Sequence, residues 1–132
     1  MSSANVLLRA IHQRLSEDAG LTALVSPDGI RDRLLARPKL PEIIFGEMET
    51  RDLSTVTEAG EEHFLVLEIW SQGEGRMLAQ EIAAKVTALL DGADLTLDGA
   101  VLVSLLRIGT RNRLEQKTRY YLSKIRFRAV TG

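Results

Sequence analysis

The sequence predicts one α+β domain, in which a mostly antiparallel sheet carries two main helices packed on one face. The first observation is a pair of segments with helical apolar spacing, one at the N-terminus and one in the middle of the chain. The second is that β-prone segments follow each of them. The third is that short polar connections separate successive strand-like segments, which favours antiparallel pairing. A chain of 132 residues matches the size of one domain, so we assign 1–132 to a single unit.

The first element is an amphipathic helix over residues 4 to about 17. Leu7, Ile11 and Leu15 recur at helical spacing, which places them on one apolar face. Ser3 stands directly before this segment. It is the expected N-cap, because a serine hydroxyl can accept a hydrogen bond from a free backbone N–H of the first turn.

Turns and extended chain follow the first helix. Residues 18–20 interrupt the helical spacing, and residues 21–25 fit a short second helical turn. Residues 26–29 read Ser-Pro-Asp-Gly, which is a strong turn signal. We expect a short extended segment over 30–35 and then a strand over 42–48, where β-prone residues gather. Two prolines between these segments exclude a helix there.

The strongest strand signal lies over residues 63–70. Leu65, Leu67 and Ile69 share one face of this strand, because side chains alternate along it. The other face carries Phe64, Val66, Glu68 and Trp70. The preceding stretch, residues 51–62, is acidic and offers little that could pack in a core. It is predicted to be a long hairpin connection or a mobile loop.

A long helix then runs to about residue 90. Residues 71–74 read Ser-Gln-Gly-Glu and match a capping box, in which a hydroxyl and a carboxylate bind free backbone N–H groups at a helix start. A wide apolar stripe follows, made of Leu78, Ile82, Ala83, Val86, Leu89 and Leu90. Asp91 and Gly92 are expected to end the helix, with glycine at its usual position after the last turn.

The rest of the chain is predicted to be strands. A short strand over 95–97 precedes a turn at residues 98–99, and a longer strand covers 101–108. Residues 111–117 form a polar connection to a closing strand over 118–130. One face of the closing strand carries Tyr121, Ile125 and Phe127, and the other carries Lys124, Arg126 and Arg128.

The composition excludes several classes of site. The chain has no cysteine, which rules out disulfides, thiol nucleophiles and cysteine-ligated metals and fits a reducing cytoplasm. The N-terminus lacks a secretory signal, and no segment reaches the ~20 apolar residues of a membrane span, so we expect no membrane contact. A formal net charge of -1 argues against a dedicated nucleic-acid binder.

We find no enzyme, no cofactor site and no metal site in the sequence. His12 and His63 are the two histidines, and both are interpreted as surface or boundary residues. Glu61 and Glu62 precede His63, but consecutive strand residues point to opposite faces and do not converge on a metal. Residues 73–76 precede a helix and contain two glycines, yet they lack the third glycine of a dinucleotide fingerprint and the lysine of a P-loop.

The charges are unevenly distributed, which is the most unusual feature. From residue 107 onward eight Lys and Arg residues accompany one acid, Glu115. The middle of the chain is acidic, with Arg51 as the only base among Glu47, Glu49, Asp52, Glu58, Glu61 and Glu62.

The cations of the closing strand, Lys124, Arg126 and Arg128, form a stripe on one sheet face. This stripe is either a solvated face with Glu68 or Glu47 as cross-strand partners, or a surface that meets an acidic partner or DNA. Trp70, Tyr120 and Leu122 share the parity of the charged faces. They are either apolar contacts at a subunit interface or residues covered by a helix of the same chain.

Several stretches together resemble a family of small tail-completion (tail-terminator) proteins of long-tailed phages and gene transfer agents. The most characteristic is HFLVLEIWS at residues 63–71, followed by Gly75-Arg76 and the long helix. The other stretches cover nearly the whole chain in the expected order: 8–25, 30–33, 40–47, 95–99, 102–105 and 125–129. The chain departs from the family pattern at Glu42, where an aromatic residue is expected after Pro41, and at residues 120–122, where Tyr-Tyr-Leu replaces a less aromatic pattern.

The resemblance implies a tail-terminator-like fold and a structural virion protein. Such a protein forms a ring, usually a hexamer, which binds the end of the tail tube, stops its polymerisation and presents a face to the neck or head-completion protein. The implied location is the tail–neck junction of a particle assembled in the bacterial cytoplasm. A ring needs a heterologous interface, and the candidate residues for it or for a partner are Glu58, Glu61, Glu62, Trp70, Tyr120, Lys124, Arg126 and Arg128.

Three alternatives stay open at this point. In the first, the basic stripe lines the lumen of the ring and contacts passing DNA. In the second, the chain is a head-completion or connector protein of the same particle, which would share its size and ring assembly. In the third, the chain is a stand-alone cytoplasmic module with a small ligand, which predicts a pocket and stabilisation by that ligand.

Overall fold

A computed structural model describes residues 2–72 and 75–132. These ranges contain three helices and six strands in the order α1 (Ala4–Ser16), α2 (Ala19–Thr22), β1 (Ile30–Arg31), β2 (Glu42–Asp52), β3 (Glu61–Ser71), α3 (Arg76–Leu90), β4 (Thr96–Leu97), β5 (Ala100–Leu114) and β6 (Tyr121–Thr131). The predicted α+β class is confirmed. Two helices, α1 and α3, are long, and α2 is a single turn.

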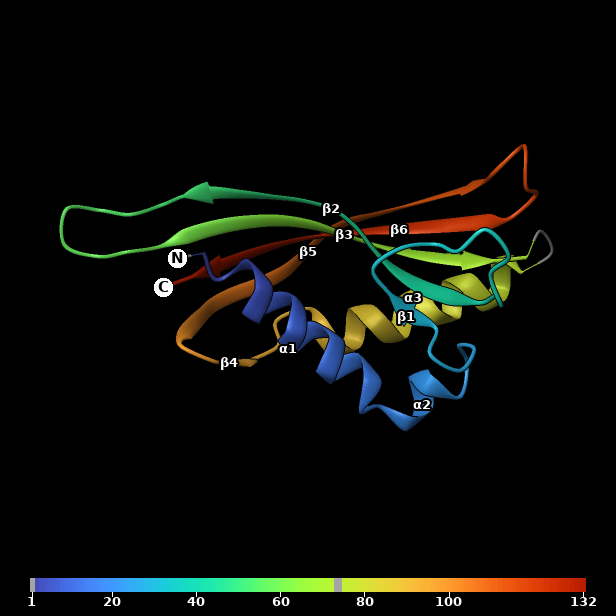
Figure 1. The fold of residues 1–132 in the computed structure, drawn as a ribbon, viewed down its shortest axis with the longest axis horizontal. Helices are drawn as coiled ribbons and strands as arrows, with labels where there is room; N and C mark the ends of the chain where they lie inside the picture. Colours follow the sequence, from blue (N-terminus) through green and yellow to red (C-terminus); the bar gives the residue numbers. More distant parts are fainter. Residues whose placement is uncertain (1, 73–74) are drawn as a thin grey trace.

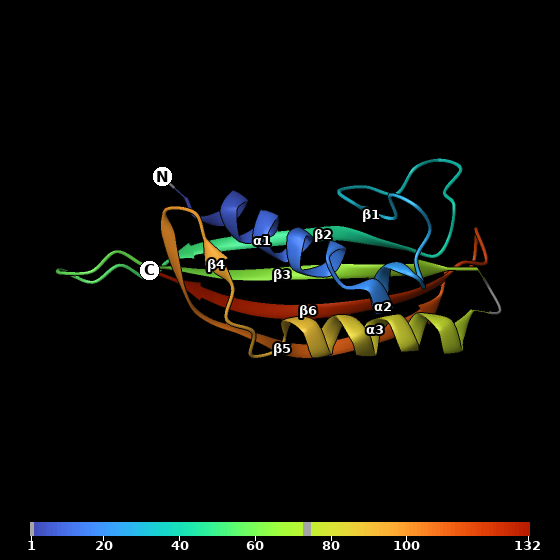
Figure 2. The ribbon, with the colours of Figure 1, turned by 90° about the horizontal axis from the view of Figure 1, so that it is seen from below.

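The sheet has the order β1-β2-β3-β6-β5-β4. β1 runs parallel to β2, and all other neighbours are antiparallel, so the sheet is mixed but mostly antiparallel. The helices lie on one side of the sheet, and in residues 2–72 and 75–132 no helix lies over the other side (Figures 1 and 2). We call the helix-covered side the inner face and the other side the outer face.

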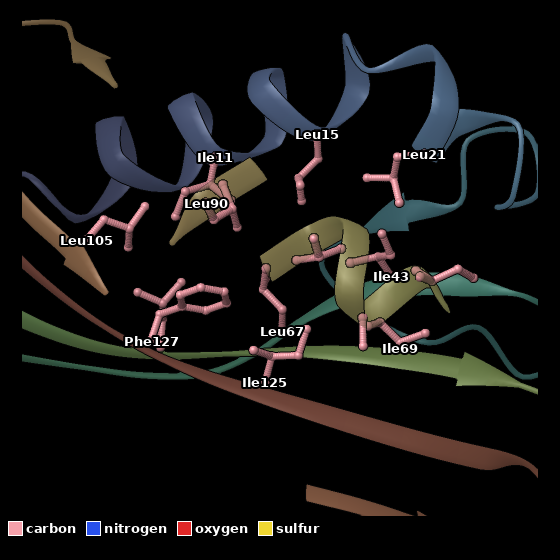
Figure 3. Packing of buried hydrophobic residues seen from close by; sticks show 14 of the residues in the cluster. Ile11, Leu15, Leu21, Ile43, Leu67, Ile69, Leu90, Leu105, Ile125 and Phe127 are labelled. Atoms are coloured by element: carbon pink, nitrogen blue, oxygen red, sulfur yellow. The ribbon is translucent and has the colours of Figure 1, made fainter. Parts of the chain in front are cut away.

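The core lies between the inner face and the two long helices, as Figure 3 shows. Leu7, Ile11 and Leu15 of α1 are fully buried, as their spacing predicted. They face strand side chains such as Leu67 and Phe127, which are also fully buried. No helix in the described part of the chain is long and apolar enough to cross a membrane.

The starts of the helices differ from the prediction. Ser3 occupies the N-cap position of α1, but its side chain makes no capping hydrogen bond. Its hydroxyl instead contacts side chains of β3 and β6. Asp18 caps α2 by accepting a bond of 2.8 Å from the Leu21 N–H. The second helix therefore begins at Ala19, inside residues 18–20, which were predicted to interrupt the helical spacing.

The capping box predicted for α3 is wrong at its first position. Ser71 is the last residue of β3, and the N-cap of α3 is Gly75. The Ser71 hydroxyl donates to the Gly75 carbonyl at 3.0 Å. Gly73 and Glu74, the other half of the predicted box, lie outside the described residues. The helix ends as predicted, with Gly92 in the left-handed region at φ 72°.

Three strands extend beyond their predicted limits. β2 continues to Asp52, β3 begins at Glu61, and β5 continues to Leu114. The connections shorten to residues 53–60 and 115–120, and the closing strand begins at Tyr121 rather than at the predicted residue 118. Of the two alternatives for residues 51–62, the hairpin connection is the correct one. The extra residues are polar and mostly exposed, so hydrophobic periodicity could not detect them; backbone pairing with the adjacent strand holds them in the sheet.

Candidate assembly surface

The outer face of the sheet collects most of the residues that the sequence singled out. On β3, the inner residues Leu65, Leu67 and Ile69 are buried, whereas Phe64, Val66, Glu68 and Trp70 on the outer face stay half-buried. The predicted division of this strand into two faces is therefore confirmed. The neighbouring strand β6 places Lys124, Arg126 and Arg128 on the same outer face, opposite Glu68, Val66 and Phe64.

Two of the three cations on β6 have acidic partners on β3. Arg128 Nε lies 2.5 Å from Glu62 Oε2, and Lys124 Nζ lies 3.9 Å from Glu68 Oε2. The predicted cross-strand role of Glu68 is confirmed. Arg126 is exposed and has no carboxylate within 4.0 Å among the residues of the described ranges. Partly exposed pairs of this kind each contribute little stability, so the stripe is only partly neutralised.

Trp70 and Tyr120 form an aromatic pair near the start of β6. Their rings meet edge to face with centroids 6.3 Å apart, and the Trp70 indole N–H donates to Glu68 Oε1 at 3.0 Å. The helices lie on the opposite side of the sheet (Figure 1). The alternative that a helix of the same chain covers these two rings is therefore wrong, and both stay partly accessible. Leu122, which pairs with Trp70 on the same face, is buried.

A shallow hollow of about 700 Å³ lies on the outer face. Glu47, Glu49 and Arg51 line one side, and Ile108 and Arg126 line the other. A second hollow continues it toward Arg111, Arg113 and Lys124. Charged side chains form four of the ten residues that line the first hollow and five of the eight that line the second, whereas pockets for small ligands are mostly apolar with a few polar groups. The hollow therefore fits a macromolecular contact better than a small-ligand site.

The acidic candidates do not gather in one place. Glu58 lies in the exposed β2–β3 connection, and Glu62 lies on the outer face with Arg128. Glu61 points to the inner side, where it accepts bonds of 2.8 Å from the Ser3 N–H and 2.9 Å from the Ser3 hydroxyl. Glu62, Trp70, Tyr120 and the three cations thus share a face, and Glu58 and Glu61 lie apart from them.

His63 is not a surface residue, and that interpretation is wrong. The side chain is fully buried, between the start of α1 and the last residues of β6. Its Nδ1 lies 2.9 Å from Thr50 Oγ1, and its Nε2 lies 3.0 Å from Thr131 Oγ1. The Ser3 hydroxyl lies 3.2 Å from the same Nε2. Glu61, two residues earlier on the same strand face, approaches to 4.0 Å.

This cluster of Ser3, Thr50, Glu61, His63 and Thr131 is not arranged as a catalytic triad. In a triad the acid binds the histidine nitrogen opposite the serine and orients the ring. Here the Thr50 hydroxyl is the partner of that nitrogen, Nδ1, and the acid Glu61 accepts a hydrogen bond from the serine itself. The cluster instead ties the N-terminus, the end of the last strand and β2 together. No group of three or more metal-ligating side chains occurs in the described ranges.

The buried histidine predicts a loss of stability in mild acid. Burial lowers the pKa of His63 below its ordinary value of 6.5, and the nearby Glu61 opposes this only in part. Below pH 6.5 the unfolded chain therefore binds a proton that the folded chain excludes, so the free energy of unfolding falls as the pH drops from 6.5 toward 5. Urea unfolding at stepped pH values measures this slope.

A His63→Gln variant should be less stable at every pH but should lose the slope between pH 6.5 and 5. His12→Gln is the matched control, because His12 is the other histidine and is exposed; it should keep the slope. Hydrogen bonds, chiefly from the Ser3 backbone N–H, hold the pKa of Glu61 below its ordinary value of 4.5. A separate loss of folding stability is therefore expected below pH 4.5, where the carboxylate of the unfolded chain takes up a proton first. An unchanged slope in His63→Gln would contradict the assignment.

A further outer-face feature escaped the sequence analysis. β5 exposes a row of apolar residues on or beside this face: Val101 and Val103 at 65%, Leu106 at 50% and Ile108 at 48%. The register of β5 against β6 shifts at Leu102/Ser104 and at Arg107/Gly109. Each such bulge inserts a residue and moves the next side chains to the other face, so simple alternation could not separate inner from outer residues.

Comparisons with known proteins agree on one kind of relative. The profile of a protein family described as "Tail completion protein gp17" matches residues 9–132. Among solved structures, a chain from the "Virion of native gene transfer agent (GTA) particle" superposes with a TM-score of 0.89 at 32% sequence identity. The match covers 99% of this chain and 98% of that one. No protein with a curated description matches the sequence.

Proposed function

Because the chain belongs to the tail completion protein gp17 family, we propose that it forms a ring on the end of a tail tube, stops tube growth there and joins the tail to the neck. The coarser role follows from membership itself: the chain is a structural protein of a phage tail or of a related particle, and it is located in the virion. A structural role depends on surfaces rather than on a catalytic centre, so a non-catalytic function is the expectation.

The observation that carries the proposal is the completeness of the match. The whole domain, rather than a shared fragment, corresponds to a chain of a gene transfer agent virion. The tail-terminator role and the hexameric ring are the finer part of the proposal, and they rest on the family resemblance of the sequence. Self-association, the tail tube protein and a neck or head-completion protein are the partners that this role requires.

The shape of the molecule supports assembly into a ring. The β2–β3 hairpin projects from one end and the β5–β6 hairpin from the other (Figure 1). The first contains the acidic stretch, and the second contains eight of the chain's 17 Lys and Arg residues. A molecule with opposite charges on different surfaces favours heterologous contacts between copies, which close into rings when the rotation between copies allows it.

The proposed contact surface is the group of side chains that share the outer face: Glu62, Trp70, Tyr120, Lys124, Arg126 and Arg128. Trp70 and Tyr120 supply partly accessible aromatic area, which is enriched in protein interfaces, and Arg126 supplies an exposed charge. Glu58, Glu61 and Glu62 lie near the other end of the sheet, beside the β2–β3 connection.

Deletion of the gene from its particle-producing host tests the proposal. We expect tails of abnormal, heterogeneous length and few complete particles, because nothing would stop tube polymerisation. Electron microscopy of purified particles measures tail length directly. A complemented strain is the control. Tails of normal length that stay detached from heads would instead support the head-completion role, and normal complete particles would overturn both.

A further inference from the structure

Two strands of the sheet have open edges within the chain. β5 pairs with β6 on one side, while β4 covers its other side only at Ala100 and Val101. The end of α3 satisfies two more groups, since the Gly92 N–H donates to the Leu105 carbonyl and the Arg107 N–H donates to Asp91 Oδ1. From residue 108 to 114 no strand of the described chain pairs with this edge.

The opposite side of the sheet has a similar opening. β1 pairs with β2 only at Ile43 and Ile44. Residues 45–52 of β2 continue along β3 with their other edge unpaired by any strand in the described ranges. In an antiparallel strand, alternate residues direct their N–H and C=O groups to each side. Both open stretches therefore present rows of backbone donors and acceptors that can extend a sheet.

The two open edges carry opposite charges. The open part of β5 holds Arg111 and Arg113, both exposed. The open part of β2 holds Glu47 and Glu49, also exposed. Arg113 contacts Glu115 at 3.3 Å and Glu49 contacts Arg51, but these are exposed pairs of little strength. Like charges opposite each other weaken strand pairing and unlike charges strengthen it.

This pattern selects one kind of contact between copies. Pairing of β5 with β5, or of β2 with β2, would place like charges together and would give a two-fold dimer. Pairing of β5 with β2 of another copy joins arginines to glutamates and is heterologous, so it can repeat around a ring. Edge charges that serve only to prevent aggregation would do so best with one sign on both edges, which is not what the sheet has.

The strand directions are compatible with this contact. β2 is antiparallel to β3, β3 to β6, and β6 to β5. β2 and β5 of one chain therefore run in opposite directions. A rotation that keeps the strand direction brings β2 of one copy against β5 of the next in the antiparallel sense. Within one chain, residues 45–52 lie level with residues 102–110 of β5, so residues 108–114 of the next copy reach them through strands that tilt across the ring axis, as the strands of a barrel do. A closed ring of this kind pairs both open stretches, as the strands of a barrel are paired.

We propose that neighbouring copies join by edge pairing, in which residues 108–114 of β5 add to residues 45–52 of β2 in the next copy, so that one continuous sheet runs around the ring. The inference rests on the proposed ring function and identifies the contact that builds the ring. The partner is thus a second copy of this chain.

Charge exchange between the two edges tests the proposal. One variant carries Arg111→Glu and Arg113→Glu, and a second carries Glu47→Lys and Glu49→Lys. Each alone should fail to assemble, with at least about a tenfold rise in the protein concentration needed for half-assembly, because like charges then face each other across every contact. Mixed in equal amounts, the two variants should assemble again, because alternating copies place opposite charges at each contact.

Expressing the same variants in the deletion strain also tests the contact when assembly occurs only on a tail tube. Each alone should fail to restore normal tails, and co-expression should restore them. Lys117→Glu with Arg119→Glu is the matched control: it reverses two charges in the connection of the same hairpin, outside the strands, and should assemble normally.

Amide hydrogen exchange separates edge pairing from simple charge attraction. Residues 108–114 and 45–52 should become protected in the assembled form and exchange faster in the monomeric variants. Full assembly of either reversed variant alone, no rescue on mixing, or unchanged exchange of both edges on assembly would overturn the edge contact. Overlong tails in the deletion strain would still uphold the proposed function in those cases, whereas normal tails without the gene would overturn that function itself.

Discussion

Replacing Phe127 with alanine is expected to lower the free energy of unfolding by about 3–5 kcal/mol. Phe127 is the largest fully buried side chain in the described structure and lies on the inner face of β6, between the sheet and the helices (Figure 3). Truncation removes the transfer free energy of the ring and leaves a cavity. The surrounding leucines and isoleucines come from several elements, so they cannot all move to fill it.

Urea unfolding followed by circular dichroism measures the change. Phe64→Ala is the matched control, because Phe64 has the same side chain on the adjacent strand but is half-buried on the outer face. Its cost should be less than half that of Phe127→Ala. Equal costs for the two variants would show that the outer face is covered in the isolated chain, contrary to the structure.

Removing Arg31 is expected to cost about 3 kcal/mol, because it leaves a buried carboxylate without its counter-charge. Arg31 Nε donates to Glu42 Oε2 at 2.7 Å; the Glu42 side chain is 0% exposed and that of Arg31 is 31% exposed. The partial exposure of Arg31 places the expected cost at the low end of the range for buried pairs. Arg31→Met keeps much of the aliphatic length and removes the charge.

The double variant Arg31→Met with Glu42→Leu should regain most of this loss, because apolar residues often replace a buried ion pair at little cost. Arg51→Met is the matched control. Arg51 pairs with Glu49 in an exposed position, where loss of the pair should change the midpoint of urea unfolding very little. A double variant as unstable as Arg31→Met alone would show that packing of Arg31, rather than its charge, stabilises β1 against β2.

The Arg31–Glu42 pair also explains the departure from the family pattern. An aromatic residue is expected after Pro41, and this chain has Glu42 instead. A carboxylate can occupy a buried position only with a charged partner. Arg31, on the two-residue strand parallel to β2, supplies it. The departure is therefore accommodated locally.

Edge pairing would give the proposed ring a specific advantage. Long unpaired strand edges invite aggregation, and closing them in a ring removes that hazard once assembly is complete. The exposed apolar row of β5, from Val101 to Ile108, lies beside the same edge. A neighbouring copy seated there would cover part of it, which fits the rule that such rows mark contacts with other proteins.

The sequence by itself determined the fold class, the position of both long helices and the two faces of β3. These features depend on apolar side chains that recur with the period of a helix or a strand, and a linear pattern records that period. The left-handed turn at Gly92 belongs to the same group, because only its own backbone conformation matters there.

The tertiary structure alone decided the buried role of His63, the true contacts of Ser3, the lengths of β2 and β5 and the open edges of the sheet. Ser3 meets Thr131 at 2.6 Å although 128 positions separate them, and Thr50 and Thr131 enclose the histidine from different strands. Contacts of this kind depend on how distant segments approach each other. Local spacing contains no record of that approach, since a polar residue in an exposed hairpin and one in a buried cluster look alike along the chain.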